Sequence, residues 1–213
     1  MISLFFTPST IKAQGEKEPI IKDSTAMFKG VAVSFDLVGA GQLLLSDYGQ
    51  YEAAVRMNLK DKYFPIAEIG YGKCDATDET TNNTYKTDAP YIRVGCDFNI
   101  LKNKHDIYRF YLGGRYAFSS YKYDVTNTTL TDPVWGDKAG INSTNNKGNQ
   151  HWLEFAAGID VKISGPIHLG WSFRYKQRLF NKNGDVGDAY YVPGYGRGGR
   201  TRLGGTFNVI FEL

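Results

Sequence analysis

The sequence of 213 residues contains no run of 18 apolar residues, which excludes a transmembrane helix but leaves open a membrane barrel built from strands. It also lacks a large charge of one sign, because 25 basic and 22 acidic residues give a net charge of +3. Nucleic acid is therefore not expected as a partner. Apolar residues are not scarce at 42%, so a largely disordered chain is disfavoured as well.

Aromatic residues and glycine are abundant. The chain has 15 Tyr, 13 Phe and 24 Gly, a combination that favours a β-sheet with many turns over helices. All-β barrels of this length are commonly single domains. The composition therefore predicts one all-β domain.

The first residues have a different character from the rest. Residues 1–14 (MISLFFTPSTIKAQ) resemble the back half of a secretory signal peptide without its basic start, which would fit a start codon further upstream. A disordered tail is the alternative. Residues 15–28 are mostly polar and are expected to form a periplasmic tether, which leaves residues 29–213 for the barrel.

Eight later segments alternate apolar and polar residues with a period of two, the pattern of half-buried strands. They run over residues 31–37, 51–59, 67–71, 92–100, 108–119, 153–163, 167–176 and 202–213. Most are about ten residues long, the length that a tilted strand needs to cross a bilayer. An even number of such strands is typical of single-chain bacterial barrels.

The connections between these segments alternate strictly between short and long. Residues 60–62, 101–106 and 164–166 form the short ones, and residues 39–50, 74–89, 120–150 and 177–201 form the long ones. This asymmetry predicts an eight-stranded antiparallel up-and-down transmembrane β-barrel of the bacterial outer membrane, with short periplasmic turns and long extracellular loops. Both termini would then be periplasmic. Hairpin pairing within such a barrel does not bring Cys74 and Cys96 together, so we expect no disulfide.

The alternative is a soluble lipid-binding barrel, in which the apolar face would line a cavity. Three features favour the membrane barrel. The polar face is rich in glycine, as a narrow lumen requires, and aromatic residues gather near both strand ends, as in interfacial girdles. The last strand is also similar to the signal that the barrel-assembly machinery recognises during insertion, although it ends in Leu instead of Phe. The residues of this signal are Phe207, Val209, Phe211 and Leu213.

In the membrane barrel the charged residues of the alternating strands face the lumen. The acids are Asp36, Glu52, Glu68, Asp97, Glu154, Asp160 and Glu212, and the bases are Arg56, Arg93, Arg109, Arg115, Lys162, Arg174, Lys176 and Arg202. An eight-stranded barrel is only wide enough for side chains, so these charges must pair with one another. We therefore predict a lumen plugged by ion pairs and not an open pore.

Few residues point to catalysis. His168 and Ser172 would lie on the same face of one strand, an arrangement that a lipid-modifying barrel enzyme could use, but no nucleophile elbow is present. We expect no catalytic residues, no cofactor and no metal site. Residues 194–200 (GYGRGGR) are interpreted as a flexible extracellular loop, whose arginines, together with Arg202, could contact lipopolysaccharide.

Four stretches carry a family resemblance: Asp47 to Lys73, Gly165 to Phe180, Tyr191 to Gly196 and Gly204 to Leu213. They resemble an uncharacterised family of Bacteroidota outer-membrane β-barrels known only as a domain of unknown function, over roughly residues 28–213. The resemblance implies an outer-membrane barrel and supplies no catalytic residue. Our prediction is a structural or accessory barrel in contact with outer-membrane lipid and lipopolysaccharide. A subunit of a larger complex for barrel assembly or transport, with protein partners, is the alternative.

Overall fold

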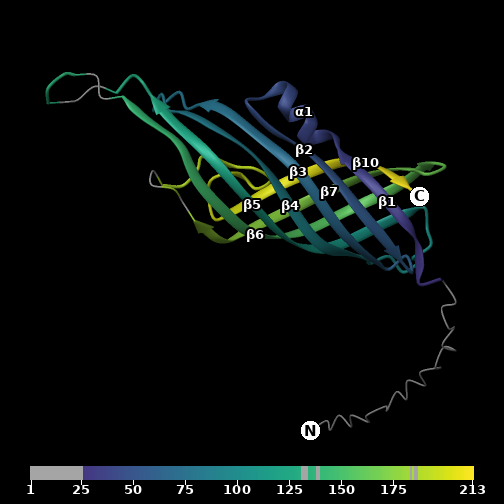
Figure 1. The fold of residues 1–213 in the computed structure, drawn as a ribbon. Coiled ribbons are helices and arrows are strands. Elements are labelled where there is room, and N and C mark those ends of the chain that lie inside the picture. Colours follow the sequence, from purple (N-terminus) through teal and green to yellow (C-terminus); the bar gives the residue numbers. More distant parts are fainter. Residues whose placement is uncertain (1–25, 131–133, 138–139, 183, 185–186) are drawn as a thin grey trace, which may run out of the picture.

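Eight antiparallel strands close into a barrel in the order β1-β10-β7-β6-β5-β4-β3-β2 (Figure 1). The computed structural model describes residues 26–130, 134–137, 140–182, 184 and 187–213, so the predicted signal-peptide remnant and most of the tether lie outside the described residues. The strands are β1 (Phe28–Asp36), β2 (Tyr48–Leu59), β3 (Tyr63–Thr77), β4 (Thr84–Asn99), β5 (Tyr108–Asn127), β6 (Ile141–Ser164), β7 (Ile167–Lys182) and β10 (Thr201–Glu212). The predicted all-β, eight-stranded fold is confirmed.

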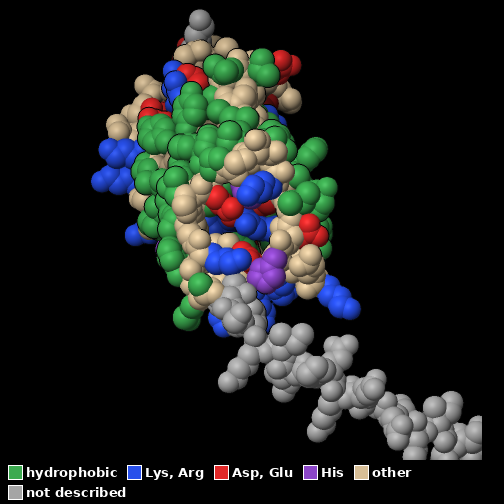
Figure 2. Space-filling view, turned by 90° about the vertical axis from the view of Figure 1, so that its right-hand side faces the viewer, with side chains coloured by type: hydrophobic (Ala, Val, Ile, Leu, Met, Phe, Trp, Pro, Cys, Tyr) green, Lys and Arg blue, Asp and Glu red, His purple; other side chains and the backbone are tan. Residues whose placement is uncertain are grey.

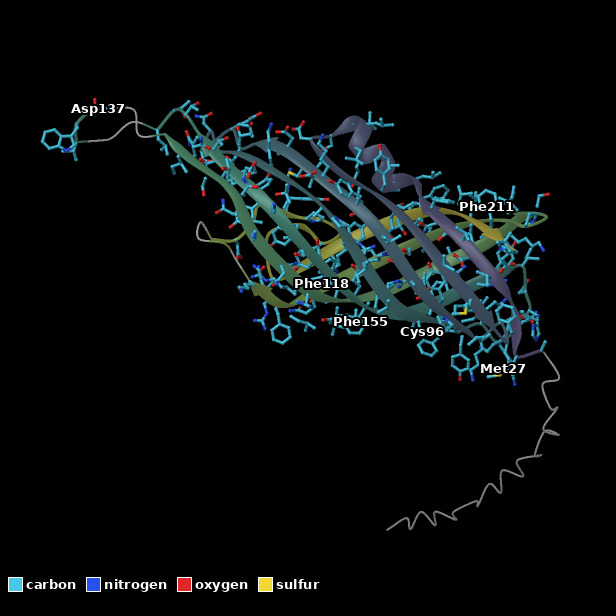
Figure 3. The ribbon with its side chains drawn as sticks, in the orientation of Figure 1. Met27, Cys96, Phe118, Asp137, Phe155 and Phe211 are labelled. Atoms are coloured by element: carbon cyan, nitrogen blue, oxygen red, sulfur yellow. The ribbon has the colours of Figure 1, made fainter. Side chains whose placement is uncertain are left out.

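The alternating pattern sorts the side chains onto two faces of the wall. Along β3, exposed and buried residues alternate from Tyr63 to Thr77, because successive side chains of a strand point to opposite faces. Between the strand ends the outward face is mostly apolar, and the buried charged residues lie on the inward face. Phe155 lies on the outer side of the wall (Figure 3). Two sets of exposed aromatic residues border the outward face: Tyr51, Tyr71, Tyr116 and Tyr175 toward the long hairpins, and Tyr63, Phe98, Tyr108 and Phe211 toward the short turns.

Several strands are longer than the alternating pattern predicts. β5 has 20 residues and β6 has 24, and their hairpin projects well beyond the rest of the barrel, with Asp137 near its tip (Figures 1 and 3). The backbone pairing continues past the apolar band, where the alternation is reversed: Tyr121 and Tyr123 are buried and Lys122 between them is exposed. Much of the predicted loops at residues 74–89 and 120–150 is therefore paired strand. β1 begins at Phe28, one residue before the predicted start of the barrel.

A helix replaces part of the first long loop. α1 (Leu37–Leu45) follows β1 directly, although Leu37 was expected in a strand and residues 39–50 in a loop. The carboxylate of Asp36 accepts hydrogen bonds from the backbone N–H groups of Val38 and Gly39, both at 3.1 Å, which caps the helix. It also accepts one at 3.1 Å from the N–H of Phe207 on β10, where a strand partner is missing. No helix among the described residues has the length and apolar character to cross a membrane.

We expect that Asp36→Ala lowers the free energy of unfolding in detergent by about 2 kcal/mol, since the helix loses its cap and the Phe207 N–H loses its acceptor. Urea titration followed by heat-modifiable gel migration measures this change. Asp36→Asn keeps an acceptor oxygen and should lose less. Equal stability of Asp36→Ala and the unsubstituted protein would contradict the role of this carboxylate.

Candidate functional site

The centre of the barrel holds a cluster of buried charges around Arg93 on β4. Its guanidinium forms ion pairs with Glu52 on β2, with Glu68 on β3 at 3.0 Å and with Glu154 on β6 at 2.8 Å. The Arg93 side chain is fully buried. Because an unpaired buried charge is costly, these three carboxylates and the arginine stabilise one another in place.

Two further arginines complete the cluster. Arg174 on β7 reaches across the lumen to Glu68, with Nη1 at 2.9 Å and Nη2 at 3.2 Å from the two carboxylate oxygens. Arg115 on β5 donates from Nε to Glu68 at 2.8 Å and from Nη2 to Asp97 at 3.0 Å. Glu68 therefore accepts from three arginines, two of which lie on strands that do not neighbour β3.

Toward the short turns, two more pairs connect strands across the lumen. Arg56 on β2 lies 2.5 Å from Asp160 on β6, and Arg109 on β5 pairs with Glu212 on β10. His168 also lies 3.0 Å from Glu212. Viewed from this end, charged side chains gather in a central hollow, and hydrophobic side chains cover much of the wall around it (Figure 2).

The segment after β7 folds into the other end of the barrel. β8 (Tyr191–Val192) and β9 (Gly196–Arg197) form a small hairpin, and residues 191–195 are all buried. The carbonyl of Gly194 accepts hydrogen bonds from Arg93 Nη2 at 2.8 Å and from Lys176 Nζ at 2.6 Å. The prediction of a flexible extracellular loop is therefore wrong for Gly194 and Tyr195.

Glycine is required at position 194. Its φ is +80°, in the left-handed region, and an added Cβ would lie 2.5 Å from the ring of Tyr91. Around it, the hairpin packs into a cluster of buried residues from the barrel wall, where the rings of Trp152 and Tyr195 meet edge to face with centroids 5.6 Å apart. The members are Ala89, Tyr91, Ala117, Tyr121, Tyr123, Trp152, Ala189, Val192 and Tyr195.

The structure brings together most of the predicted lumen residues, but three lie elsewhere. Asp36 caps α1 and has no ion pair among the described residues, because three backbone N–H groups occupy its carboxylate. Lys162 is exposed at the rim near the short turns. Arg202 lies at the opposite rim, where its guanidinium donates to the carbonyl of Arg197 at 2.6 Å and to that of Gly198.

The residues considered for catalysis are not in contact as a pair. Ser172 shares a hydrogen bond of 2.7 Å with Thr206, and His168 faces Glu212 instead. Both cysteines are free. Among the described residues, no group of three or more His, Cys, Asp or Glu side chains could hold a metal ion.

Two aromatic residues that bind carboxylates of the charge cluster around Arg93 are not among the predicted lumen residues. The Tyr91 hydroxyl donates to Glu52 at 2.7 Å, and Trp152 Nε1 donates to Glu154 at 2.6 Å. Tyr91 lies one residue before the predicted strand at residues 92–100, and Trp152 lies one residue before the predicted strand at residues 153–163. Extending the period of two by one position in each strand would have placed both side chains in the lumen.

At the end with the short turns, a cavity of about 430 Å³ opens between Lys29, Arg56, Arg109 and Lys162. Asp61, in the turn between β2 and β3, lines it and lies 2.5 Å from Lys29 and 2.6 Å from His105. Burial alone would raise the pKa of Asp61. Hydrogen bonds from Lys29, Asn58 and His105 outweigh that effect and hold its pKa below the ordinary value of an aspartate.

A closed antiparallel barrel with an apolar outer band and a charged, packed interior places this chain in the class of small eight-stranded membrane-type β-barrels. The chain belongs to the family described as Domain of unknown function (DUF6048), which matches residues 1–212.

Two solved structures resemble the fold. One is a major outer membrane protein from Thermus thermophilus, with 12% identity, 87% of this chain and 100% of that chain covered, and a TM-score of 0.49. The other is Neisserial surface protein A (NspA), with 12% identity, 88% and 98% covered, and a TM-score of 0.43. No curated protein sequence matches the chain.

We expect Arg93→Met to lower the free energy of unfolding by about 3–5 kcal/mol, because it leaves buried carboxylates without their partner. Arg178→Met is the matched control. Arg178 pairs with Asp188 at 3.0 Å in a more exposed position, where loss of an ion pair costs about 0–1 kcal/mol. Similar losses in the two variants, measured by urea titration in detergent, would show that the central cluster does not depend on Arg93.

Proposed function

We propose that this protein is an outer-membrane β-barrel with a structural or accessory role, whose lumen is closed by the central ion pairs and by residues 191–195. The proposal rests on how little space is left at the centre of the lumen. The cavity between Arg56, Glu68, Arg115, Asp160 and Arg174 measures about 20 Å³, room for about one water molecule. This central cavity is too small for a hydrated ion, which supports a closed lumen.

The placement in the membrane rests on the outer face. The exposed apolar band is bordered by the two sets of aromatic residues, an arrangement typical of strands whose ends meet the two interfaces of a bilayer. The described N-terminal end of β1 and the C-terminal end of β10 lie beside the short turns. By the asymmetry of outer-membrane barrels, this end faces the periplasm and the long hairpins face outward.

Planar-bilayer recording tests the closed lumen. We expect no steady conductance from the unsubstituted protein. A variant with Glu52, Glu68, Arg93 and Arg174 all changed to Ala removes two acids and two bases together, so the charge balance is kept while the central barrier is widened. This variant should show discrete conductance steps. Large steady channels from the unsubstituted protein would contradict the proposal.

A second candidate function, a subunit of a larger outer-membrane complex, is favoured by the projecting β5–β6 hairpin. The side chains of Val134 and Trp135 are 76% and 80% exposed, and both residues lie within three positions of Asp137 at the hairpin tip (Figure 3). Neighbouring apolar side chains that are exposed together outside a membrane are typical of contact sites for other proteins. The hairpin therefore offers a surface for a protein partner.

Under this second candidate, Trp135→Ser should shift the protein from a larger species to the monomer on native gels of membranes solubilised in mild detergent. Leu45→Ser is the control, because Leu45 is 90% exposed on α1 but distant from the hairpin tip. Migration of the unsubstituted protein as a monomer alone would count against a complex.

A further inference from the structure

The barrel wall has an interrupted seam beside α1. β1 pairs with β10 over only five register positions, from Ala32 to Asp36, and then gives way to the helix. Beyond that level, residues 48–52 of β2 pair with β3 alone, and residues 201–207 of β10 pair with β7 alone. α1 lies between these two strand edges, packed closely on β2, where an added Cβ on Gly49 would lie 2.5 Å from the backbone nitrogen of Leu43.

A cationic pocket opens at this seam. It measures about 240 Å³, and its polar lining includes Gln42 of α1, Gln50 of β2, Lys176 of β7, Arg197 of β9 and Arg202 of β10. No carboxylate lines it, and none of its three cations has an ion pair among the residues that the structure describes. Lys176 is buried and donates only to the carbonyls of Gly194 and Tyr195. The lining of the pocket therefore holds three basic side chains and no acidic one.

An apolar groove adjoins the pocket on the outer wall. It measures about 540 Å³ and is lined by Leu37, Val38, Gln42, Trp171, Gly205 and Phe207. Gln42 and Gly205 line both spaces, so the groove and the cationic pocket are direct neighbours. The rings of Trp171 and Phe207 form one side of the groove, with centroids 6.3 Å apart.

The two spaces lie at different depths in the proposed membrane. Leu203 pairs with Tyr175, which belongs to the aromatic set near the long hairpins. Arg202 and Lys176 pair one position nearer the hairpins, and Trp171 and Phe207 pair four positions further into the apolar band. Arg202 and Lys176 are therefore at the level of lipid headgroups, and the groove is at the level of acyl chains.

We propose that this composite site binds a phosphorylated lipid of the outer leaflet, with a phosphate in the cationic pocket and an acyl chain in the groove beside α1. Guanidinium and ammonium groups bind phosphate through charge-assisted hydrogen bonds, and basic pockets at headgroup depth are suited to anionic lipids. The site rests on the proposed membrane placement and is independent of whether the lumen is closed.

Native mass spectrometry of the full chain in detergent tests the site, with diphosphoryl lipid A and its phosphate-free form as probes. We expect Arg197→Gln to weaken binding of diphosphoryl lipid A at least fivefold. The Arg197 guanidinium lies over the Tyr48 and Tyr190 rings at 5.0 and 5.5 Å, on the surface, so the variant should keep the fold. Arg200→Gln, which removes the same charge from the same segment outside the pocket, should change binding less than twofold.

The apolar half has its own matched pair of variants. Trp171→Ala should weaken binding of both lipid forms, whereas Phe155→Ala, an equally lipid-facing change on β6, should not. Equal binding of the two lipid forms would overturn the phosphate site, because the phosphate charge would then contribute nothing. Equal effects of Arg197→Gln and Arg200→Gln would overturn it in favour of diffuse charge attraction. Heat-modifiable migration and bilayer recording on the same preparations report separately on the fold and on the closed lumen.

Discussion

The neutralisation of charge inside a narrow barrel is the constraint on which this structure depends. Leaving aside Asp36, which caps α1, and Asp61, which lies in a turn, the buried charged residues are five acids and five bases. The acids are Glu52, Glu68, Asp97, Glu154 and Asp160, and the bases are Arg56, Arg93, Arg115, Arg174 and Lys176. Among the described residues, all of them except Lys176 form ion pairs with one another, and removing a paired member leaves its buried partner without compensation.

The ion pairs also connect strands that share no backbone hydrogen bonds. Arg174 on β7 meets Glu68 on β3, and Arg56 on β2 meets Asp160 on β6. Backbone pairing alone fixes each strand to its two neighbours and would allow the cross-section to flatten. Because buried ion pairs require good geometry and contribute little net free energy, their main effect here is to fix the distance between opposite walls.

The period of two predicted the strands and their faces because inward polar or small residues alternate with outward apolar ones, as over residues 153–161 of β6. It failed where local contacts decide the structure. α1 is only nine residues long and carries no charged residue, so no helical period stands out, and the Asp36 carboxylate that starts it looked like one more lumen charge. The inward fold of residues 191–195 depends on the φ of Gly194 and on two cations that reach its carbonyl, contacts that no strand pattern contains.

The alternating strands predict eight bases and seven acids on the inward face, one base in excess. In the structure, two of these bases bind backbone carbonyls instead of carboxylates. Lys176 does not pair with a carboxylate among the described residues and instead donates to the backbone of the inward hairpin. Arg202 does the same at the rim, through the carbonyls of Arg197 and Gly198. Carbonyl oxygens satisfy the hydrogen-bond donors of these side chains but do not cancel their charge. Basic side chains without a carboxylate partner therefore lie at the seam beside α1, where β1 no longer pairs with β10.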